Sequence, residues 1–232
     1  MIRLLAALFA CLTVSVVLVV AIINRSLPEG NLPAQVAERL PETGVSHAVT
    51  AVLLDFRSYD TLLEVAVLLV AVVVAMALRE AQPDGPDRMG LANPLLRAVV
   101  SWLLPLMLLV AAYLLWAGSS MPGGAFQAGA VLAAAGVLLR LAGVGFNWME
   151  HPMRLRVVLA AGLAVFVAVG TGCLIAGRAF LDYPPKFAGS LILFIECAVT
   201  LSIALALVSL LQLAPPQEDG PLLPERRRRF RK

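Results

Sequence analysis

The sequence has few of the residues from which soluble enzymes build their sites. Only 14% of its residues are charged, against about a quarter in a soluble domain. Its two His and three Cys occur singly, without the spacing of a metal site or a disulfide framework. It contains no GxxxxGKS/T, GxGxxG, GxSxG or HExxH pattern. We therefore expect no cofactor, no metal centre and no enzyme acting alone.

Long apolar runs are what the sequence has instead. Apolar residues make up 60% of the chain, and a run of about 20 of them, at about 1.5 Å per residue, crosses the roughly 30 Å of a membrane's hydrocarbon. Such continuous runs are helices, because lipid offers no partner for unpaired backbone groups. We predict an all-α integral membrane protein with about six transmembrane helices. The runs are Leu4–Ile23, Leu62–Leu78, Val99–Ala117, Ala125–Gly143, Val157–Ala176 and Phe187–Leu213.

The first of these runs has to be distinguished from a signal peptide. Its apolar stretch exceeds the roughly 7–15 residues of a signal core. No small-x-small cleavage site follows it before Asn24. We interpret the run as a retained transmembrane helix.

The basic residues predict the orientation of the chain. With a cytoplasmic N-terminus and six crossings, 13 Lys and Arg residues lie on cytoplasmic segments and four on outer ones, with Arg57 set aside, as the positive-inside rule requires. Both termini are then expected to be cytoplasmic. The net charge of +3 reflects this topology and does not indicate a nucleic-acid partner. The basic tail, 215–232, is expected to be disordered and drawn to anionic membrane lipid.

A polar linker divides the chain. Residues 82–93 contain QPDGPDR, which is typical of a turn-forming cytoplasmic segment. We predict a two-span unit with a broken helix over 1–81 and a four-span unit over 94–214. The polar, Pro-containing segment Asn24–Gly44 is expected to be an outer loop with a short helix around Ala34–Leu40.

The helical pattern breaks just before the second long run. In Val45–Thr61 the apolar stretch Ala48–Leu54 is too short to span a membrane and indicates a short re-entrant or interfacial helix. It ends in a charged corner, from Asp55 to Asp60, and a full helix then begins at once. Irregular backbone at membrane depth is tolerated only against protein or a water-filled cavity. Ion sites tend to be built at such breaks.

The charged residues of this corner allow two interpretations. Thr61 and Glu64 fit a capping box, with Thr61 as the N-cap, but Glu64 also fits a protonatable or cation-binding carboxylate at the half-helix junction. Asp55 and Asp60 flank Arg57. They form either a solvated turn with a local ion pair or a carboxylate cluster that binds a cation or passes a proton.

Two further ionisable residues stand apart. Glu196 is the only charged residue between Lys186 and Glu218. A charge at mid-helix costs roughly 2.5–3.5 kcal/mol on insertion scales, so it should face a partner or water. Glu196 is either a proton-relay or ion-path residue, or a neutral, hydrogen-bonded Glu that shares a network with Thr200. His47, which begins the short helix, is either a satisfied polar residue or a proton carrier.

A Pro-Gly-Gly sequence opens the fourth span. Gly123 and Gly124, which follow Pro122, permit a tight turn and a close backbone approach. Gln127 follows in the first turn of the helix. The structural interpretation is favoured for these residues. A small-xxx-small face for helix contact comes next, formed by Ala125, Gly129 and Ala133.

The segment around the break resembles a known family. His47–Ala71 is similar to the C-terminal region of the large A-type chain of Mrp-type Na+/H+ antiporters, an element that forms a separate small subunit in membrane-bound hydrogenases. Ser58 and Leu63 replace two glycines of the family pattern, which should stiffen the corner. The matching residues are Asp55, Phe56, Arg57, Asp60, Thr61 and Glu64.

A second segment resembles another component of the same antiporters. Leu95–Gly143 is similar to the MnhB subunit, and Glu196 falls where that family often keeps an acidic residue in its last span. The chain therefore resembles a natural fusion of the end of the large A-type chain with MnhB. The matching residues of the second segment are Pro122, Gly123, Gly124, Phe126 and Gly129.

The resemblance implies a function for the whole chain. It implies a subunit of a multi-subunit Na+/H+ antiporter, driven by the proton-motive force without ATP, that lines part of an ion path and holds neighbouring subunits together. The implied partners are large complex I-like subunits and small subunits similar to Mrp C, E, F and G. Two alternatives stay open: a membrane-arm subunit of a membrane-bound hydrogenase or related redox-driven pump, and a purely structural membrane subunit.

Overall fold

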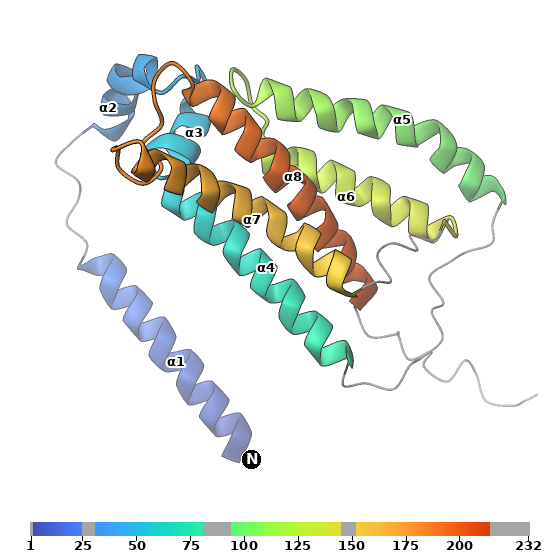
Figure 1. Cartoon of the computed structure of the whole chain (residues 1–232). Coiled ribbons are helices and arrows are strands. Elements are labelled where there is room, and N and C mark those ends of the chain that lie inside the picture. Colours follow the sequence, from blue (N-terminus) through green and yellow to red (C-terminus); the bar gives the residue numbers. More distant parts are fainter. Residues whose placement is uncertain (1, 25–30, 81–93, 145–151, 214–232) are drawn as a thin grey trace, which may run out of the picture. The chain divides into compact units, whose positions relative to one another are not determined.

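The computed structural model describes residues 2–24, 31–80, 94–144 and 152–213, and all regular structure among them is helical (Figure 1). The chain divides into two compact units, Met1–Glu38 and Arg39–Lys232, which are described separately. The first contains α1 (Ile2–Ile23) and nearly all of α2 (Leu32–Arg39). The predicted all-α fold is confirmed. The predicted linker, 82–93, and the basic tail, 215–232, lie outside the described residues.

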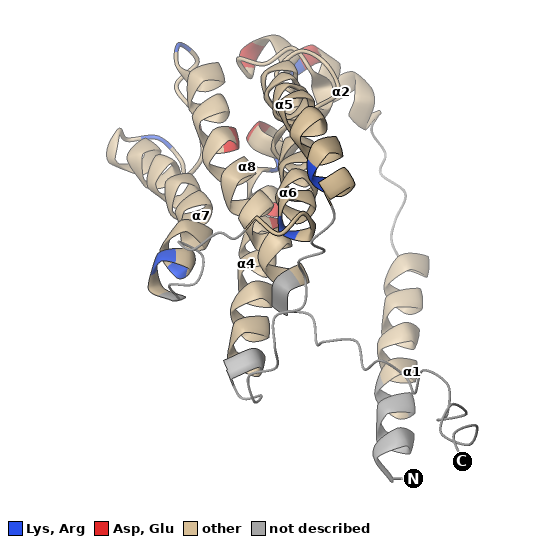
Figure 2. Cartoon of the chain, turned by 90° about the vertical axis from the view of Figure 1, so that its right-hand side faces the viewer, with Lys and Arg blue, Asp and Glu red and all other residues tan. Residues whose placement is uncertain are grey.

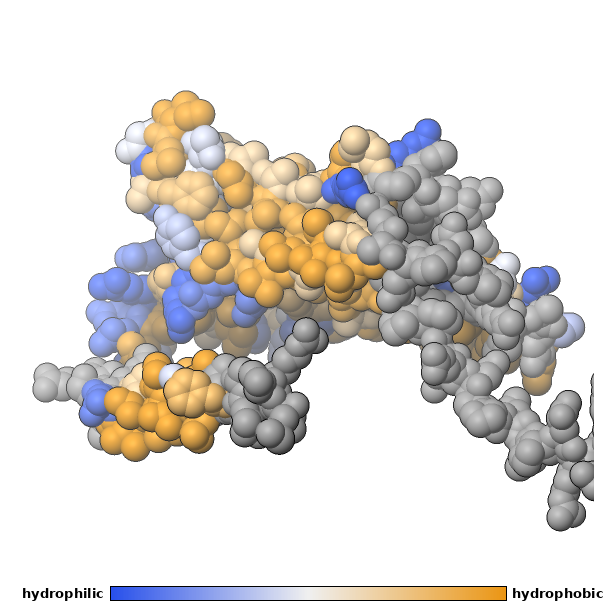
Figure 3. Space-filling model, turned by 90° about the horizontal axis from the view of Figure 1, so that it is seen from below, coloured by the Kyte–Doolittle hydropathy of each residue, from blue (hydrophilic) through white to orange (hydrophobic). Residues whose placement is uncertain are grey.

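The apolar runs of the sequence form the long helices. Of the described helices, α4 (Ser58–Glu80), α5 (Pro94–Ala117), α7 (Pro152–Ile175) and α8 (Ala188–Leu213) are long and apolar enough to cross a membrane. The apolar helix α6 (Ala125–Leu141) has 17 residues and α1 has 22. Charged residues are sparse along these ribbons, and the bundle presents a broad apolar surface (Figures 2 and 3). The chain is a multi-pass membrane protein.

Helix α8 is the centre of the second unit. It packs against α4, α6 and α7, and 56% of its most apolar window is buried, against 28% or less in the other three long helices. Its apolar residues interlock with Phe166 of α7 and Val65 of α4 in one core cluster. The fully or nearly fully buried residues that α8 gives to this cluster are Ala188, Ile192, Ile195, Val199 and Ile203.

The predicted small-residue face of α6 lies against α8. A methyl group added to Gly129 would lie 2.9 Å from Ile203 Cγ2 and 3.2 Å from the Thr200 carbonyl oxygen. Ala133, one turn further, is 5% exposed. Small residues at these positions let the two helix backbones approach closely, as the sequence pattern predicts.

The predicted break in the second span is present. Helix α3 (Ala48–Ala51) passes into a π-helical turn, η2 (Val52–Phe56), and Arg57 then leaves the helical conformation with φ −129° and ψ 37°. A π turn inserts one extra residue into the helical repeat. It therefore changes the direction of the residues that follow.

The capping-box interpretation of Thr61 and Glu64 is wrong. Helix α4 begins at Ser58, three residues before Thr61, so Thr61 is not its N-cap. The Thr61 hydroxyl instead donates to the Leu53 carbonyl across the break (2.7 Å). The charged corner itself supplies the first turn of α4, which places Glu64 deeper in the helix than the sequence predicts.

A matched pair of glycine substitutions tests the close approach of α6 and α8. Gly129→Ala should lower the free energy of unfolding by about 1–3 kcal/mol, because the added methyl group overpacks the contact with Ile203. Gly172→Ala, in α7, meets nothing within 4 Å and should be neutral or stabilising by up to about 1 kcal/mol. Thermal unfolding of the full chain in detergent measures both. Equal shifts for the two variants would show that the α6–α8 contact is not tight.

Candidate functional site

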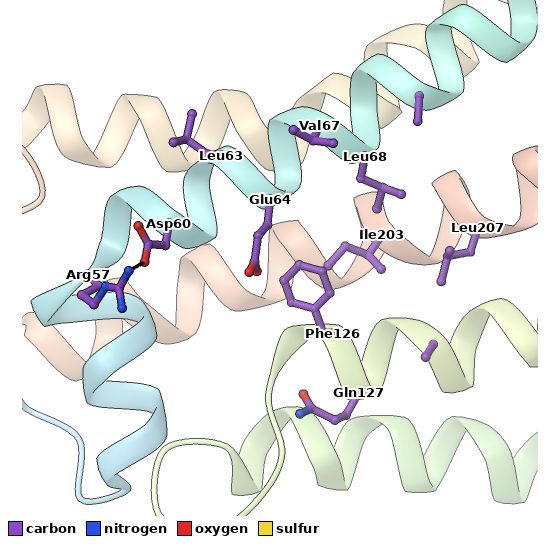
Figure 4. A pocket seen from close by; sticks show the side chains of 12 residues that line it. Arg57, Asp60, Leu63, Glu64, Val67, Leu68, Phe126, Gln127, Ile203 and Leu207 are labelled. Atoms are coloured by element: carbon purple, nitrogen blue, oxygen red, sulfur yellow. Dashed lines mark ion pairs between the residues drawn. The ribbon is translucent and has the colours of Figure 1, made fainter. Parts of the chain in front are cut away.

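An open groove runs between α4 and α6, with α8 as its floor. Its volume is about 1060 Å³. Both walls pack on α8 but have little direct contact with each other, so side chains of all three helices face the same space (Figure 4). Its polar residues come from the charged corner, from α4 and from the start of α6. They are Arg57, Asp60, Glu64 and Gln127.

At one end of the groove, Arg57 forms an ion pair with Asp60 (Figure 4). The two side chains are 69% and 44% exposed. An exposed pair of this kind contributes less than about 1 kcal/mol to stability. The local pair predicted from the sequence is therefore present. The Arg57 guanidinium neutralises the charge of the Asp60 carboxylate, and Asp60 still lines the groove.

Glu64 is the unpaired carboxylate of the groove among the described residues. It lies six residues into the span that begins at Ser58, or about 9 Å along the helix. Its side chain is exposed and points toward Phe126 of α6 (Figure 4). Because a charge facing hydrocarbon is costly, this carboxylate requires water, an ion or a neighbouring protein.

Glu196 is buried on the other side of the α6 N-terminus. It lies on α8 and is only 3% exposed. The backbone N–H of Ala125 donates to its carboxylate. The first amides of a helix have no partner within the helix and carry its positive dipole, so this is a favourable place for a carboxylate. Of the partner or water that the sequence predicts for Glu196, the structure gives a backbone partner, the Ala125 amide.

Gly124 allows this contact between helix and carboxylate. Its φ of +117° lies in the region that side chains rarely adopt, and an added Cβ would lie 3.0 Å from Glu196 Oε1 and 3.6 Å from Gln127 Oε1. The two side chains thus approach Gly124 from its open side. Gln127 also lines the groove, so it is near both the groove and Gly124.

Thr200 does not join Glu196 in the way the sequence suggested. Its hydroxyl donates to the backbone carbonyl of Glu196 (2.6 Å), with a second acceptor in the Ala125 carbonyl (3.4 Å). Both acceptors are backbone carbonyls: that of Glu196 lies one turn back in α8, and that of Ala125 lies on α6. Thr200 therefore holds α8 and α6 together and leaves the Glu196 carboxylate to the Ala125 amide.

The turn between α5 and α6 also holds the broken helix in place. The backbone amides of Ser46 and His47 both donate to the Ser119 carbonyl (2.9 and 3.1 Å). The Thr50 hydroxyl donates to the Gly118 carbonyl. His47 Nδ1 lies 3.3 Å from the Thr50 hydroxyl. His47 is therefore a hydrogen-bonded residue of this joint and does not line the groove.

Pro122 and Gly123 complete the turn that starts α6. The Gly124 amide donates to the Leu114 carbonyl of α5 (2.9 Å). A side chain at Gly123 would overlap the same carbonyl oxygen. The predicted tight turn is therefore present, and it fixes where the first amides of α6 point.

The structure does not gather Asp55, Asp60 and Glu64 into one carboxylate cluster. No group of three or more His, Cys, Asp and Glu among the described residues is placed to hold a metal ion. Asp55 does not line the groove, and it lies within electrostatic range of Asp182 and Tyr183 in the loop between α7 and α8. Sequence reasoning missed both of these residues, because a lone Asp-Tyr pair in a short loop carries no recognisable spacing.

Comparison with known families identifies half of the chain. The model of a domain related to the MnhB subunit of Na+/H+ antiporters matches residues 95–210. The chain belongs to this family. The MnhB-related domain covers half of the chain and contains the α6 turn, Gln127 and Glu196, whereas the broken helix and Glu64 precede it. The predicted resemblance to MnhB is confirmed.

Relatives of the MnhB-related chain extend the match. It is 29% identical over 194 residues to a probable K+/H+ antiporter A/B-type component of Rhizobium meliloti (strain 1021), covering 72% of this chain and 19% of that protein. It is 30% identical over 158 residues to an uncharacterized protein of Methanocaldococcus jannaschii, covering 59% of this chain and 60% of that protein. The chain spans less than two thirds of the length of either relative.

Two solved structures have the same fold. A chain of the Mrp complex from Dietzia sp. DQ12-45-1b matches 94% of this chain and 27% of its own length, with a TM-score of 0.63 and 23% identity. A chain of an archaeal respiratory membrane complex, the membrane-bound sulfane sulfur reductase, matches 92% of this chain and 98% of its own length, with a TM-score of 0.65 and 24% identity. At these identities the likeness concerns the fold.

Substitutions of Glu196 test its contact with α6. Glu196→Ala leaves the buried Ala125 amide without an acceptor and should cost about 1–3 kcal/mol of stability. Glu196→Gln keeps an acceptor oxygen at the same place and should cost clearly less. Thermal unfolding of the full chain in detergent compares the two variants. Equal losses would contradict the assigned contact.

The pH dependence of stability tests the surroundings of Asp55. Burial raises the pKa of the Asp55 carboxyl above its ordinary value of 3.8, and the nearby Asp182 raises it further. The folded chain then keeps this proton to higher pH than the unfolded chain, so stability falls as pH rises from 3.8 through the folded pKa. Asp55→Asn should flatten that fall, and Glu42→Gln, which removes an exposed carboxylate, should not. The measurement is the stability of the full chain to unfolding in choline salts, followed across this pH range for the wild type and both variants.

Proposed function

We propose that the chain is a subunit of a multi-subunit Na+/H+ antiporter in a bacterial inner membrane, with both termini in the cytoplasm. Membership of the MnhB-related family supports this proposal, as does the similarity to a relative named as a probable K+/H+ antiporter component of A/B type. The chain acts in transport and not as an enzyme. The large proton-translocating subunits and the small Mrp-like subunits come from other chains.

Within that complex, the chain contributes part of an ion path. The observation that carries this proposal is the Glu196 carboxylate, which is 3% exposed inside a membrane bundle and has the Ala125 amide as its donor. A carboxylate so placed can take up and release a proton or a cation while the helix terminus stabilises its charge. A mere packing contact would not require an ionisable group there.

The groove supplies access to this carboxylate. Glu64 receives the ion or proton at the exposed face, and Gln127, near both the groove and Gly124, leads toward Glu196. Ordered water can bridge polar groups that are too far apart for a direct hydrogen bond. Asp60, paired with Arg57, sets the charge at the groove's entrance. A neighbouring protein of the complex closes the exposed side of the groove, where Glu64 would otherwise face lipid.

Antiport by the assembled complex tests these roles. Glu64→Gln and Glu196→Gln should each reduce Na+-dependent proton exchange by about tenfold or more, because an amide cannot carry the proton or the charge. The measurement is Na+-induced collapse of a pH gradient in membrane vesicles that contain the whole complex. Glu42→Gln, at an exposed residue of the short 3-10 helix Leu40–Glu42, is the matched control and should transport normally.

Assembly separates a role in transport from a structural one. Native gels of the same membranes should show full assembly for both Gln variants. Wild-type exchange rates in either variant would disprove its place in the path. A loss of assembly that matches the loss of transport would instead make the acid a structural residue.

The co-purifying chains test which complex contains this protein. The antiporter proposal expects large complex I-like membrane subunits and small hydrophobic ones in stable association with the tagged full chain. A nickel–iron or iron–sulfur protein in the same particle would favour a redox-driven complex instead.

A further inference from the structure

The groove between α4 and α6 has the dimensions of a docked helix. Its lining on α4 extends from Asp60 to Ala71, a length of about 16 Å. A helical segment of that length and about 10 Å in diameter occupies on the order of 1,200 Å³, and the groove has a volume of about 1060 Å³. Since its two walls have little direct contact, one further helix fits between them on the floor that α8 provides.

The groove face of α4 has the repeat by which one helix packs along another. A row of exposed residues on α4 is spaced alternately by three and four residues, the a/d spacing of helix packing. The row covers about 21 Å of the helix, and its first three members line the groove. The opposite face of α4 is already in use, because Val65 and Val72 are buried in the core. The residues of the row are Glu64, Val67, Ala71, Val74 and Leu78.

The α6 wall of the groove is made of small residues at its centre. Ala130 lines the groove, and Ala134 lies one turn further along α6; both are exposed. They are distinct from Gly129 and Ala133, which are buried. Small residues four apart on a membrane helix let another helix approach closely. The wall therefore leaves room for a helix backbone beside α6.

The charge of Glu64 indicates the chemistry of the occupant. Its carboxylate is exposed and has no hydrogen bond or ion pair among the described residues. Arg57, the basic residue of the groove lining, is already in an ion pair. Next to Glu64 the lining is apolar, with Val67 and Phe126 (Figure 4). A carboxylate in such surroundings within a membrane requires a partner. A lipid acyl chain brings none, whereas a Lys or Arg brings a cation on an apolar stem that can pack on these residues.

We propose that a transmembrane helix of a neighbouring subunit docks in this groove and places a Lys or Arg side chain against Glu64. The helix packs along the exposed row of α4 and against Ala130 of α6. Because one basic group meets one carboxylate, the pair also fixes the register of the docked helix. During transport, the incoming cation competes with this basic group for Glu64. The inference rests on the proposed function for the presence of neighbouring subunits.

Photo-cross-linking in membranes that contain the whole complex tests the occupant. The photoreactive residue p-benzoylphenylalanine replaces Val67, which is 69% exposed in the groove, or Leu109 of α5, which is 68% exposed outside it. Irradiation of the Val67 variant should join the chain to one other subunit. The attachment site should lie in a transmembrane segment, with a Lys or Arg within about two helical turns of it. The Leu109 variant should not give this product.

The charge at position 64 tests the pairing. In the Val67 cross-linking background, Glu64→Lys should lower the yield of the product by about tenfold or more, because two cations repel each other in an apolar groove. Glu64→Gln still accepts a hydrogen bond and should keep most of the product. Replacing the identified Lys or Arg of the neighbouring subunit by Glu should restore the yield in the Glu64→Lys variant.

A matched pair of alanine substitutions tests the fit of the helix. Ala130→Phe places a large ring in the groove and should also lower the yield by about tenfold or more. Ala112→Phe adds the same ring at an exposed position of α5 outside the groove and should leave the yield unchanged. Thermal unfolding of the purified full chain should show that both variants fold.

Three results would overturn the inference. The first is a Val67 variant that attaches only to lipid, to a second copy of this chain or to another segment of the same chain. The second is attachment to a helix without a basic residue near the site. The third is an equal yield with Glu64 and with Glu64→Lys. The predicted product in a particle with a nickel–iron or iron–sulfur protein would refute the proposed antiporter function alone. Antiport by a complex with no protein attached at Val67 would refute this inference alone.

Discussion

A carboxylate inside a membrane-spanning bundle needs a positive counterpart, and here the backbone of α6 supplies it. The Ala125 amide at the start of that helix meets Glu196 of α8, so the position of the first residues of α6 decides whether the acid can be buried at all. That position depends on Gly124, whose φ of +117° turns the chain into the helix without a side chain in the way. It depends equally on Gly129, which lets α6 lie close to α8. The turn, the small-residue face and the acid are thus parts of one arrangement.

The same turn ties the broken helix to the MnhB-related domain. Carbonyl groups at its α5 side, on Gly118 and Ser119, accept hydrogen bonds from Thr50 and from the amides that precede α3. Glu64 follows that break on α4, and α4 packs on α7 and α8. The register between the groove carboxylate and the buried one is therefore set by two backbone hydrogen bonds, which depend little on side-chain identity, and by the side-chain hydroxyl of Thr50.

Much of this could be predicted from the sequence, and the failures have physical causes. The helices follow from apolar length alone, and the break follows from an apolar stretch too short to span. The burial of Glu196 follows from the cost of charge in lipid. The sequence predicts the wrong first residue for α4, because Thr61 and Glu64 have the spacing of a capping box. In the structure the Thr61 hydroxyl instead donates to the Leu53 carbonyl in the π turn, across the break. The position of Asp55 near Asp182 and Tyr183 depends on the extra residue that the π turn inserts into the helix and on tertiary packing. Neither leaves a periodic pattern in the sequence.

The shared floor of the groove has a mechanical consequence. Because α4 and α6 each rest on α8 and have little direct contact, a small tilt of one wall changes the spacing between Glu64 and Gln127, and a tilt of α4 also shifts Val65 against the core residues Ile195 and Phe166. The hinge for such a tilt is the joint at Arg57, the one residue between η2 and α4 that lies outside both helices. A neighbouring protein that leans on α4 could thereby widen or narrow the space beside the carboxylates while the bundle stays folded.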